Sequence, residues 1–359
     1  MSASVASATA ELWRYRMGKA ITASGVDSID VVVTTLTLED GRTGWGFSTV
    51  FAGADDVPLH AAKHLLERFV VGQPLGHPLA LWRRIAAAFN RTGRGPYFTA
   101  LASIDVAAWD LYAKTLGVPI GVAMGGAPRR AQVYASGSFA PGQDPDEAVA
   151  LALAYQRRGA RGVKLRAGGT PHDARVIRAV AEAVGGAIDV MVDANQRCTL
   201  TTAARLLRTC AEFGVRFVEE PVPLSYRSGY EALARTSPVP IATGENLQGS
   251  VEAAPFLFGQ WCSVIQPDLR VMGGLSECLR TAQLAEHCNI EVAPHYLPGL
   301  FIQLAAAVPH LTWLEEFPTI EPMFATMPAM ERDGYMTLPD TPGHGLVAAA
   351  GARETFMIA

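Results

Sequence analysis

The chain has 359 residues, of which 49% are hydrophobic and 18% are charged, and its formal net charge at pH 7 is −4. This composition is typical of a folded globular protein with a sizeable core, and it excludes a disordered chain. The basic residues form scattered short pairs and no continuous stripe, which argues against a nucleic-acid partner.

The cysteines and the apolar runs indicate where the protein works. The five cysteines are odd in number and form no C-x-x-C pair, which favours reduced thiols over a disulfide framework or a zinc site. Residues 1–16 lack the basic start and long apolar core of a signal peptide, and no uninterrupted apolar run reaches membrane-spanning length. We therefore expect a cytoplasmic protein without a membrane partner.

The first part of the chain predicts strands followed by helices. Residues 30–38 are rich in β-branched side chains, and a Glu-Asp-Gly turn leads from them into residues 43–47, which predicts an antiparallel hairpin. Helical patterns follow at residues 56–70, 78–89 and 97–116. A turn-rich segment at residues 124–128 marks a boundary, so we expect an α+β domain over residues 1–128.

Strands and helices alternate from residue 132 onward. The strand candidates are residues 132–139, 162–167, 189–195, 215–220, 239–244, 263–268, 291–295 and 311–315. This alternation predicts an α/β barrel, because a parallel sheet must have both faces covered. We assign residues 129–317 to the barrel domain, and we expect residues 318–359 to be irregular and to pack back on the first domain.

Three of the predicted strands lead into an acid. Asp193, Glu219 and Glu245 follow apolar runs at intervals of 26 residues. The C-terminal ends of parallel barrel strands meet at one mouth, so the three carboxylates are expected to converge there. Like charges that close together need a cation, and all-oxygen ligands suit a hard ion such as Mg²⁺. The alternative is that three surface acids fall in phase by chance.

Other strand ends carry cations and a candidate base. Lys164 and Arg166 are two residues apart, so they share one face of a strand and need anions nearby, unless they only extend along the barrel rim. Asp268 and His295 end neighbouring strands, where the carboxylate would fix the imidazole tautomer and raise its pKa. The pattern alone leaves open whether Glu315, in the last strand, faces the site.

Together these side chains predict a defined chemistry. A divalent metal that binds a substrate carboxylate opposite a histidine base lowers the cost of removing the proton α to that carboxylate, because it stabilises the enediolate. The glycine-rich runs lack the spacing of a phosphate-binding or dinucleotide-binding motif, so they are interpreted as turns. The expected partner is therefore a small-molecule carboxylate substrate.

In combination, these motifs resemble the enolase superfamily, specifically its mandelate racemase / muconate lactonizing enzyme-like subgroup. The resemblance covers nearly the whole chain. It implies an α/β fold in which an N-terminal α+β capping domain precedes a modified (β/α)7β TIM-type barrel and a C-terminal return to the cap. A homo-oligomer is also expected from the resemblance.

The resemblance further implies the roles of single residues. The family's Mg²⁺ ligands fall on Asp193, Glu219 and Glu245, and its aspartate–histidine dyad falls on Asp268 and His295. The lysine and the glutamate that bind the substrate carboxylate in the family fall on Lys164 and Glu315. Asn195 and Glu220 are expected to contact the metal ligands. Capping segments Met17–Asp27 and Phe51–Asp55 are expected to cover the barrel mouth and to set specificity.

One position departs from the subgroup's usual pattern. The second lysine of its K-x-K motif, which acts as a base opposite the histidine, is replaced by Arg166. A guanidinium is a poor proton acceptor, and its fork suits binding a carboxylate or hydroxyl. Racemisation needs a base on each face, whereas dehydration needs only one, so we favour an acid-sugar dehydratase in which His295 abstracts the α proton and a 2-keto-3-deoxy acid is formed.

Two alternatives remain open. The first is a racemase, epimerase or cycloisomerase of a carboxylate substrate, with Lys164 or a deprotonated Arg166 as the second base. The second is a non-catalytic relative that binds a carboxylate ligand as a sensor. The complete set of metal acids and the dyad weigh against the second alternative, and the substrate itself is left open.

Overall fold

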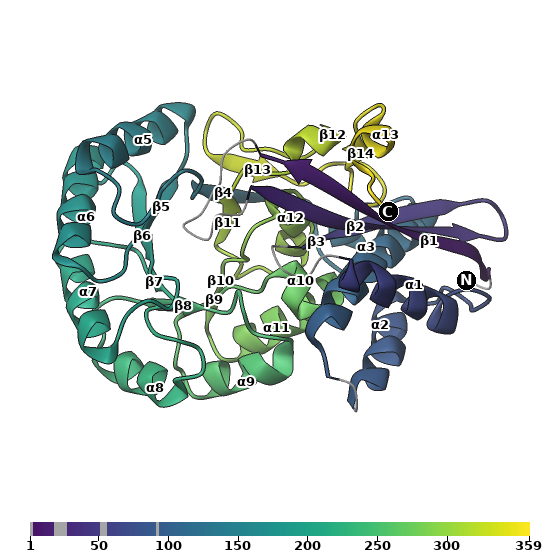
Figure 1. Ribbon diagram of the computed structural model, residues 1–359, viewed down its shortest axis with the longest axis horizontal. Coiled ribbons are helices and arrows are strands. Elements are labelled where there is room, and N and C mark those ends of the chain that lie inside the picture. The colour runs from purple at the N-terminus through teal and green to yellow at the C-terminus, as the bar shows by residue number, and fades with distance from the viewer. Residues whose placement is uncertain (1–2, 18–26, 51–55, 91–92) are drawn as a thin grey trace.

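The computed structural model describes residues 3–17, 27–50, 56–90 and 93–359. The two expected covering segments therefore lie outside the described residues, apart from Met17 and Asp27, whose backbones are joined by a hydrogen bond of 2.8 Å. Figure 1 shows a barrel ringed by helices at one side of the molecule and a smaller layer of strands and helices at the other.

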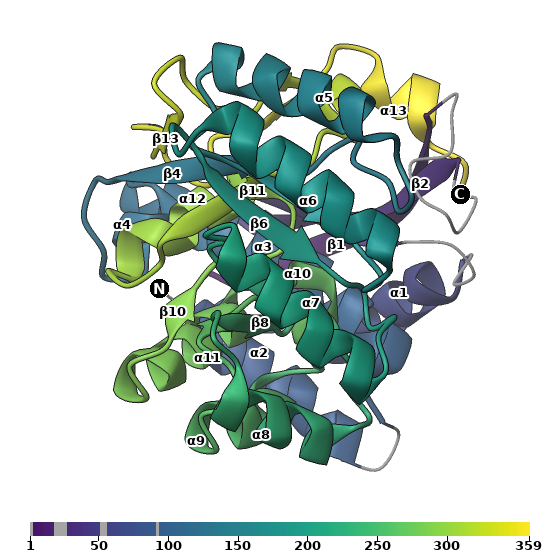
Figure 2. The ribbon, with the colours of Figure 1, turned by 90° about the vertical axis from the view of Figure 1, so that its left-hand side faces the viewer.

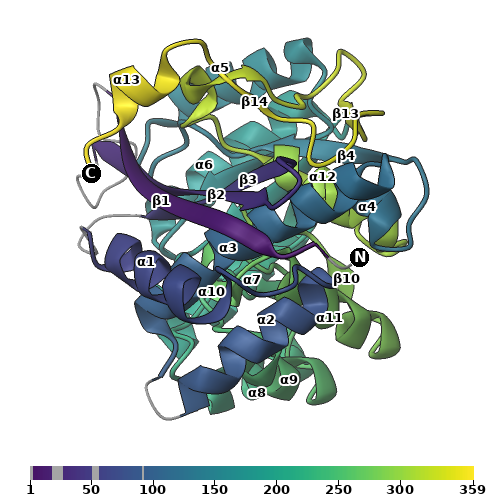
Figure 3. The same ribbon diagram turned by 90° about the vertical axis from the view of Figure 1, so that its right-hand side faces the viewer.

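The smaller domain is a three-stranded antiparallel sheet with helices packed on it. Its elements are β1 (Val5–Arg16), β2 (Ser28–Leu38), β3 (Thr43–Val50), α1 (Val57–Phe69), α2 (Pro78–Ala86), the 3₁₀ turn η1 (Ala87–Asn90), α3 (Gly95–Leu116) and α4 (Ile120–Ala123). The predicted hairpin is confirmed, since β2 pairs with β3 in a register that places Val33 opposite Phe47. Figure 3 shows β1 lying across the outer side of this domain, beside α1 and α2.

The larger domain is a barrel of parallel strands. The strands are β4 (Arg130–Ala135), β5 (Gly162–Arg166), β6 (Asp189–Asp193), β7 (Val218–Glu219), β8 (Ile241–Thr243), β9 (Val264–Ile265), β10 (Glu291–Val292) and β11 (Trp313–Glu316). They follow one another in chain order around the barrel, with β11 beside β4, and a bridge between Val292 and Leu311 joins β10 to the start of β11. The expected α/β barrel is confirmed.

Seven helical connections cover the outside of the barrel. They are α5 (Pro145–Arg158), α6 (Pro171–Val184), α7 (Leu200–Glu212), α8 (Arg227–Thr236), α9 (Ser250–Phe258), the pair α10 (Leu269–Met272) and α11 (Leu275–His287), and α12 (Pro298–Ala307). Figure 2 shows α5, α6 and α7 lying in front of the strands. Seven strand–helix units followed by a final strand make the (β/α)7β order.

The last segment of the chain contacts both domains. It contains η2 (Glu321–Met323), β12 (Phe324–Thr326), β13 (Tyr335–Thr337), β14 (Val347–Ala348) and α13 (Ala352–Phe356). The sequence predicted residues 318–359 to be irregular, but β13 pairs antiparallel with β4, because the partner that stabilises so short a strand is distant in sequence. At the end of the chain, Ile358 donates its N–H to the carbonyl of Leu12 in β1 at 2.8 Å.

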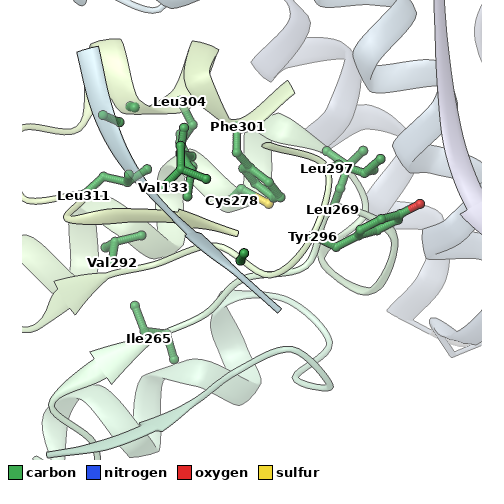
Figure 4. Packing of buried hydrophobic residues seen from close by; sticks show 14 of the residues in the cluster. Val133, Ile265, Leu269, Cys278, Val292, Tyr296, Leu297, Phe301, Leu304 and Leu311 are labelled. Carbon is green, nitrogen blue, oxygen red and sulfur yellow. The ribbon is translucent and has the colours of Figure 1, made fainter. Parts of the chain in front are cut away.

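Two layers of apolar side chains hold the barrel. An outer layer lies between strands and helices, where Phe301 and Leu304 of α12 pack with Val133 of β4 (Figure 4). An inner cluster fills the interior and consists of Tyr134, Met191, Phe217, Ala242, Val264, Ala293 and Trp313. Because this cluster closes the interior, polar side chains further along the strands are confined to the barrel mouth.

Two further observations concern the helices and the cysteines of the described residues. No helix in the described part of the chain is long and apolar enough to cross a membrane. All five cysteines are described, and none forms a disulfide.

A buried contact joins the capping domain to the barrel. Asp105 of α3 is buried and accepts hydrogen bonds from the N–H and hydroxyl of Ser276, at 2.9 and 2.6 Å, in the first turn of α11. Asp105 therefore satisfies part of the helix N-terminus, which carries partial positive charge. Gly274 precedes α11 with a φ of +117°, and a Cβ there would lie 2.4 Å from a carboxylate oxygen of Asp105, so glycine is required.

Asp105 should make stability depend on pH. Burial raises the pKa of Asp105 to about 7, although the hydrogen bonds from Ser276 lower it. Between pH of about 4 and 7 the folded state therefore binds a proton that the unfolded state has released, and this contribution to stability is lost as the pH rises. Between pH 5 and pH 8 the free energy of unfolding of the wild type should fall by about 2 to 3 kcal/mol more than that of Asp105→Asn. Urea unfolding at both pH values measures this difference.

Asp340→Asn, at an exposed position, is the matched control for this measurement. It should follow the pH dependence of the wild type. Equal pH dependence in Asp105→Asn and Asp340→Asn would contradict the expectation, because Asp105 would then titrate alike in the folded and unfolded states.

Candidate active site

Three carboxylates converge at the mouth of the barrel. Asp193 and Glu219 are the last residues of β6 and β7 and lie side by side in the parallel register, and Glu245 follows β8 by two residues. One oxygen from each carboxylate lies within 4.8 Å of the corresponding oxygens of the others. The sequence spacing of one βα unit thus corresponds to adjacent strands in space.

The backbone before Glu245 has a close neighbour. Gly244 has a φ of +134°, and a Cβ at this position would lie 2.9 Å from the backbone nitrogen of Gln266. A side chain would both strain this conformation and collide with the next strand, so glycine lets the chain that carries Glu245 pass close to β9.

The donor set of this cluster fits a hard divalent cation. Asp193 and Glu219 are buried, and Glu245 is nearly so. Glu219 Oε1 is buried and has no hydrogen-bond partner among the described residues. Uncompensated buried carboxylates are costly, and oxygen ligands alone suit Mg²⁺ or Ca²⁺ better than a transition metal.

Asparagine and glutamine residues donate hydrogen bonds to the acids at the mouth. Asn195 donates to Asp193 through its backbone N–H at 2.7 Å and its side chain at 3.0 Å. Glu220, which is fully buried, accepts from Gln196 at 2.8 Å and from Asn246 at 3.1 Å. Burial and the neighbouring carboxylate of Glu245 raise the pKa of Glu220 to about 8.

Lys164 is fixed between two acids. Its ammonium lies 2.7 Å from Glu219 Oε2 and 2.8 Å from Glu315 Oε1, and all three side chains are fully buried. The ring of Tyr134 lies below it, with 5.4 Å between the ammonium and the ring centroid. Burial alone would lower the pKa of Lys164, but the two carboxylates outweigh it and hold that pKa above its ordinary value.

Arg166 faces the same mouth from the end of β5. It is in register with Asp193 on the neighbouring strand, and its guanidinium forms an ion pair with the Asp193 carboxylate. It also donates to Asn195 Oδ1 at 3.4 Å. The structure therefore places this cation against a candidate metal ligand, with only 13% of its side chain exposed.

His295 and Asp268 form a hydrogen-bonded pair across two strand ends. His295 Nδ1 lies 2.8 Å from Asp268 Oδ2, and Asp268 Oδ1 accepts from the N–H of Arg270 at 2.9 Å at the start of α10. This arrangement leaves His295 Nε2 facing the cluster, 3.2 Å from Glu245 Oε2. Burial lowers the pKa of His295, but Glu245, Glu315 and Asp268 together raise it to about 9.

Glu315 of β11 also faces the site. Besides the contact with Lys164, its Oε2 accepts from the backbone N–H of Tyr296 at 3.0 Å and lies 3.9 Å from His295 Nε2. The sequence pattern left the direction of this side chain open, and the structure places it inside the mouth. Burial raises the pKa of Glu315, but Lys164 and His295 outweigh this effect and lower it.

Several contacting residues were missed by sequence reasoning. Gln266, Asn246 and Gln196 all donate to buried acids at the mouth. Gln266 could have been found, because it lies two residues before Asp268 and so shares the same strand face. The amides of Asn246 and Gln196 had no comparable signal, since each contacts an acid that follows a different strand.

The candidate catalytic and metal-binding side chains come from successive strands around the mouth of the barrel. In the order of the strands they are Lys164 and Arg166 at β5, Asp193 at β6, Glu219 at β7, Glu245 after β8, Asp268 after β9, His295 after β10 and Glu315 at β11. Lys164 and His295 thus lie on β5 and just after β10, and in the strand order β6, β7 and β8, which lead to the carboxylates, stand between these two strands. Figure 1 shows these strands around the barrel. A substrate at the mouth would meet a cation from one side and an imidazole from the other.

Relatives with known activities match most of the chain. L-Talarate/galactarate dehydratase of Salmonella typhimurium is 31% identical over 332 residues, which are 91% of this chain and 82% of that protein. D-Galactarolactone cycloisomerase of Agrobacterium fabrum is 31% identical over 349 residues, or 90% of each chain. The crystal structure of L-talarate dehydratase from Polaromonas sp. JS666, complexed with Mg and L-glucarate, matches with a TM-score of 0.92 and 28% identity over 100% of this chain and 98% of that chain.

Family models match both domains. The N-terminal domain of mandelate racemase / muconate lactonizing enzyme matches residues 5–125, and the enolase C-terminal domain-like model matches residues 147–351. The second match alone covers more than half of the chain. The chain therefore belongs to the mandelate racemase / muconate lactonizing enzyme group of the enolase superfamily.

Proposed function

We propose that the protein catalyses the Mg²⁺-dependent dehydration of an acid sugar to a 2-keto-3-deoxy acid. The observation that carries the proposal is the placement of one imidazole and one fixed cation on opposite sides of the carboxylate cluster. His295 keeps Nε2 directed into the mouth, whereas Lys164 is bound by two buried carboxylates. The dehydratases among the relatives support the same reaction class.

The metal would be held by Asp193, Glu219 and Glu245. Bound there, Mg²⁺ supplies positive charge that attracts the substrate carboxylate and offsets the negative charge that develops on it as the α proton leaves. Lys164 adds a second, fixed positive charge at the same place, because Glu219 and Glu315 hold its ammonium. Glu315 itself stays ionised, because Lys164 and His295 lower its pKa, and its role is to hold this ammonium in place.

The proton transfers fall to His295. A cation held by Glu245 would offset the negative charge that raises the pKa of His295, so that the neutral imidazole could take the proton from the α carbon at Nε2. Asp268 holds the imidazole in the orientation and tautomer that direct Nε2 into the mouth. The bond from the β carbon to its hydroxyl then breaks, and the same proton, returned by His295, leaves with the hydroxyl as water. The resulting enol rearranges to the 2-keto acid, so the reaction needs no second base.

The properties of Arg166 favour a reaction in which a base acts on only one face of the substrate. The Arg166 guanidinium is paired with Asp193 and can hold an oxygen of the substrate, but a guanidinium is a poor proton acceptor. Lys164 is also unsuited to act as a second base, because leaving its pair with Glu219 and Glu315 would strand two buried carboxylates. Both observations favour dehydration over racemisation.

The second candidate function is an isomerisation of a carboxylate substrate. It is favoured by the galactarolactone cycloisomerase, whose identity to this chain is as high as that of the talarate/galactarate dehydratase. Such a reaction begins with the same α-proton abstraction but loses no water. The products therefore separate the two functions.

The remaining expectations are consistent with this role. We place the protein in the cytoplasm, in the breakdown of carbohydrate acids, because all of its cysteines are free and its substrate would be a small metabolite. We assign the cover over the barrel mouth to the domain of residues 1–128, and we expect a homo-oligomer.

The first test is a screen of acid sugars with Mg²⁺ in D₂O. We expect one or a few sugars to yield a 2-keto acid, followed by semicarbazide absorbance, and EDTA to abolish the activity until Mg²⁺ is restored. Deuterium incorporation at the α carbon without keto acid would instead support the isomerase. Binding of acid sugars with neither outcome would support a non-catalytic binding protein.

His295→Asn should nearly abolish turnover. General base catalysis typically contributes a factor of about 10² to 10⁴, so we expect kcat to fall by about 10³ or more while the variant still binds Mg²⁺. His60→Asn is the matched control, because His60 is an exposed helix residue, and it should keep the activity of the wild type. Substantial activity in His295→Asn would exclude His295 as the base.

Arg166→Lys should add a base on the other side of the site. A lysine there can accept a proton when its amine is neutral, so we expect the variant to exchange the α hydrogen of the C2 epimer of the substrate with D₂O, measured by NMR. The wild type and the control Arg197→Lys, at an exposed rim position, should not exchange it. Exchange of both epimers by the wild type would show that two bases already operate.

A further inference from the structure

The two carboxylate oxygens of Glu219 have different surroundings. Oε2 accepts two hydrogen bonds of 2.7 Å, one from the ammonium of Lys164 and one from Nε2 of Gln266. Oε1 is buried and has no hydrogen-bond partner among the residues that the structure describes. One oxygen is therefore fully engaged by the protein, while the other remains available to a cation.

Gln266 is held rigidly in this position. It is fully buried next to the end of β9, and its backbone N–H donates to the carbonyl of Thr243 in β8 at 2.8 Å. The close approach of Gly244 to its backbone nitrogen leaves little room for a shift of the strand. Its side chain thus starts from a fixed point on the sheet, as a residue that positions a ligand must.

The two ends of the Gln266 amide are satisfied unequally. Nε2 donates to Glu219, whereas Oε1 is buried without a hydrogen-bond partner in the described part of the chain. An unpaired buried carbonyl lowers stability, and an apolar side chain of similar volume would avoid that loss. The functional part of this side chain is therefore its Nε2–H group, which donates to Glu219.

We propose that Gln266 is a positioning residue that, together with Lys164, restricts Glu219 to one metal-binding oxygen and thereby makes the centre select Mg²⁺ over Ca²⁺. The inference rests on the metal site in the proposed function. Mg²⁺ requires about six ligands in octahedral geometry, whereas Ca²⁺ accepts up to about eight and is often bound by both oxygens of one carboxylate. Holding Oε2 of Glu219 withholds the second oxygen that a larger ion would use.

A neutral donor suits this task better than a charged one. Lys164 already contributes a positive charge to Glu219 Oε2. A second ammonium beside it would repel an incoming divalent cation, and a carboxylate would repel Glu219 itself. An amide holds the oxygen without changing the net charge of the centre.

The test compares metal affinities of wild type, Gln266→Met and Gln266→Asn by titration calorimetry, with MgCl₂ and CaCl₂ separately and no substrate. Methionine removes the donor at similar volume, and asparagine keeps an amide that is one methylene too short to reach Glu219. Changes in the groups that support metal ligands typically alter affinity about 10- to 100-fold. We expect the ratio of the Kd for Ca²⁺ to the Kd for Mg²⁺ to fall at least about tenfold in both variants.

Gln303→Met is the matched control. Gln303 is also fully buried, but it accepts from the N–H of Gly121 and donates to the carbonyl of His344, far from the carboxylate cluster along the chain and in another part of the fold. It should lower the melting temperature without changing the ratio of the two dissociation constants. A loss of stability alone thus cannot imitate the expected result.

The outcomes separate the two levels of the proposal. A wild-type protein that binds neither ion would overturn both the metal site and the role of Gln266. A wild type that prefers Mg²⁺, with the same ratio in every folded Gln266 variant, would overturn only the role of Gln266. Gln266→Asn keeps the test open if Gln266→Met does not fold, because asparagine preserves a polar side chain at this position.

Discussion

Repulsion among buried carboxylates is the constraint on which the rest of the site depends. The mouth of the barrel contains the acids Asp193, Glu219, Glu220, Glu245, Asp268 and Glu315, against the cations Lys164 and Arg166 and the imidazole of His295. Burial disfavours each charge, so every acid must be paired, hydrogen-bonded or bound to a cation. Glu219 meets this requirement with two kinds of partner. Lys164 and Gln266 donate to one of its oxygens and leave the other oxygen for a metal.

At one strand end the fold meets this constraint by giving the two oxygens of a carboxylate different uses. Asp268 begins α10 with one oxygen and orients His295 with the other. Left-handed backbone follows the strands at Asn195, Gln196, Glu220, Tyr296 and Leu297, where non-glycine residues cost of order 1 to 3 kcal/mol each. At Tyr296 the strained conformation serves the site, because the left-handed backbone directs the N–H of Tyr296 to the carboxylate of Glu315.

Period and pattern were enough to predict the barrel and the convergence of three acids at its mouth, but not the contacts among the side chains there. Asp193, Glu219 and Glu245 could be selected because each follows an apolar strand at the interval of one βα unit. The donors Gln266 and Asn246 act across strands, so their partners depend on the register of the closed barrel, which a linear pattern does not contain. The same limit explains β13, a strand of only three residues that exists because β4 offers it an edge.

The capping domain anchors α11, the helix that follows Asp268. Only α10 and a Gly-Gly turn separate Asp268 from α11, whose first turn is held by Asp105 of the cap. Trp82 donates to the carbonyl of Gly273 at 2.7 Å and Trp109 to the hydroxyl of Ser276 at 2.9 Å, both from the cap. A displacement of the cap would therefore move the loop that carries Asp268, and with it the orientation of His295. The cap is therefore mechanically connected to the pair of Asp268 and His295 through this short segment.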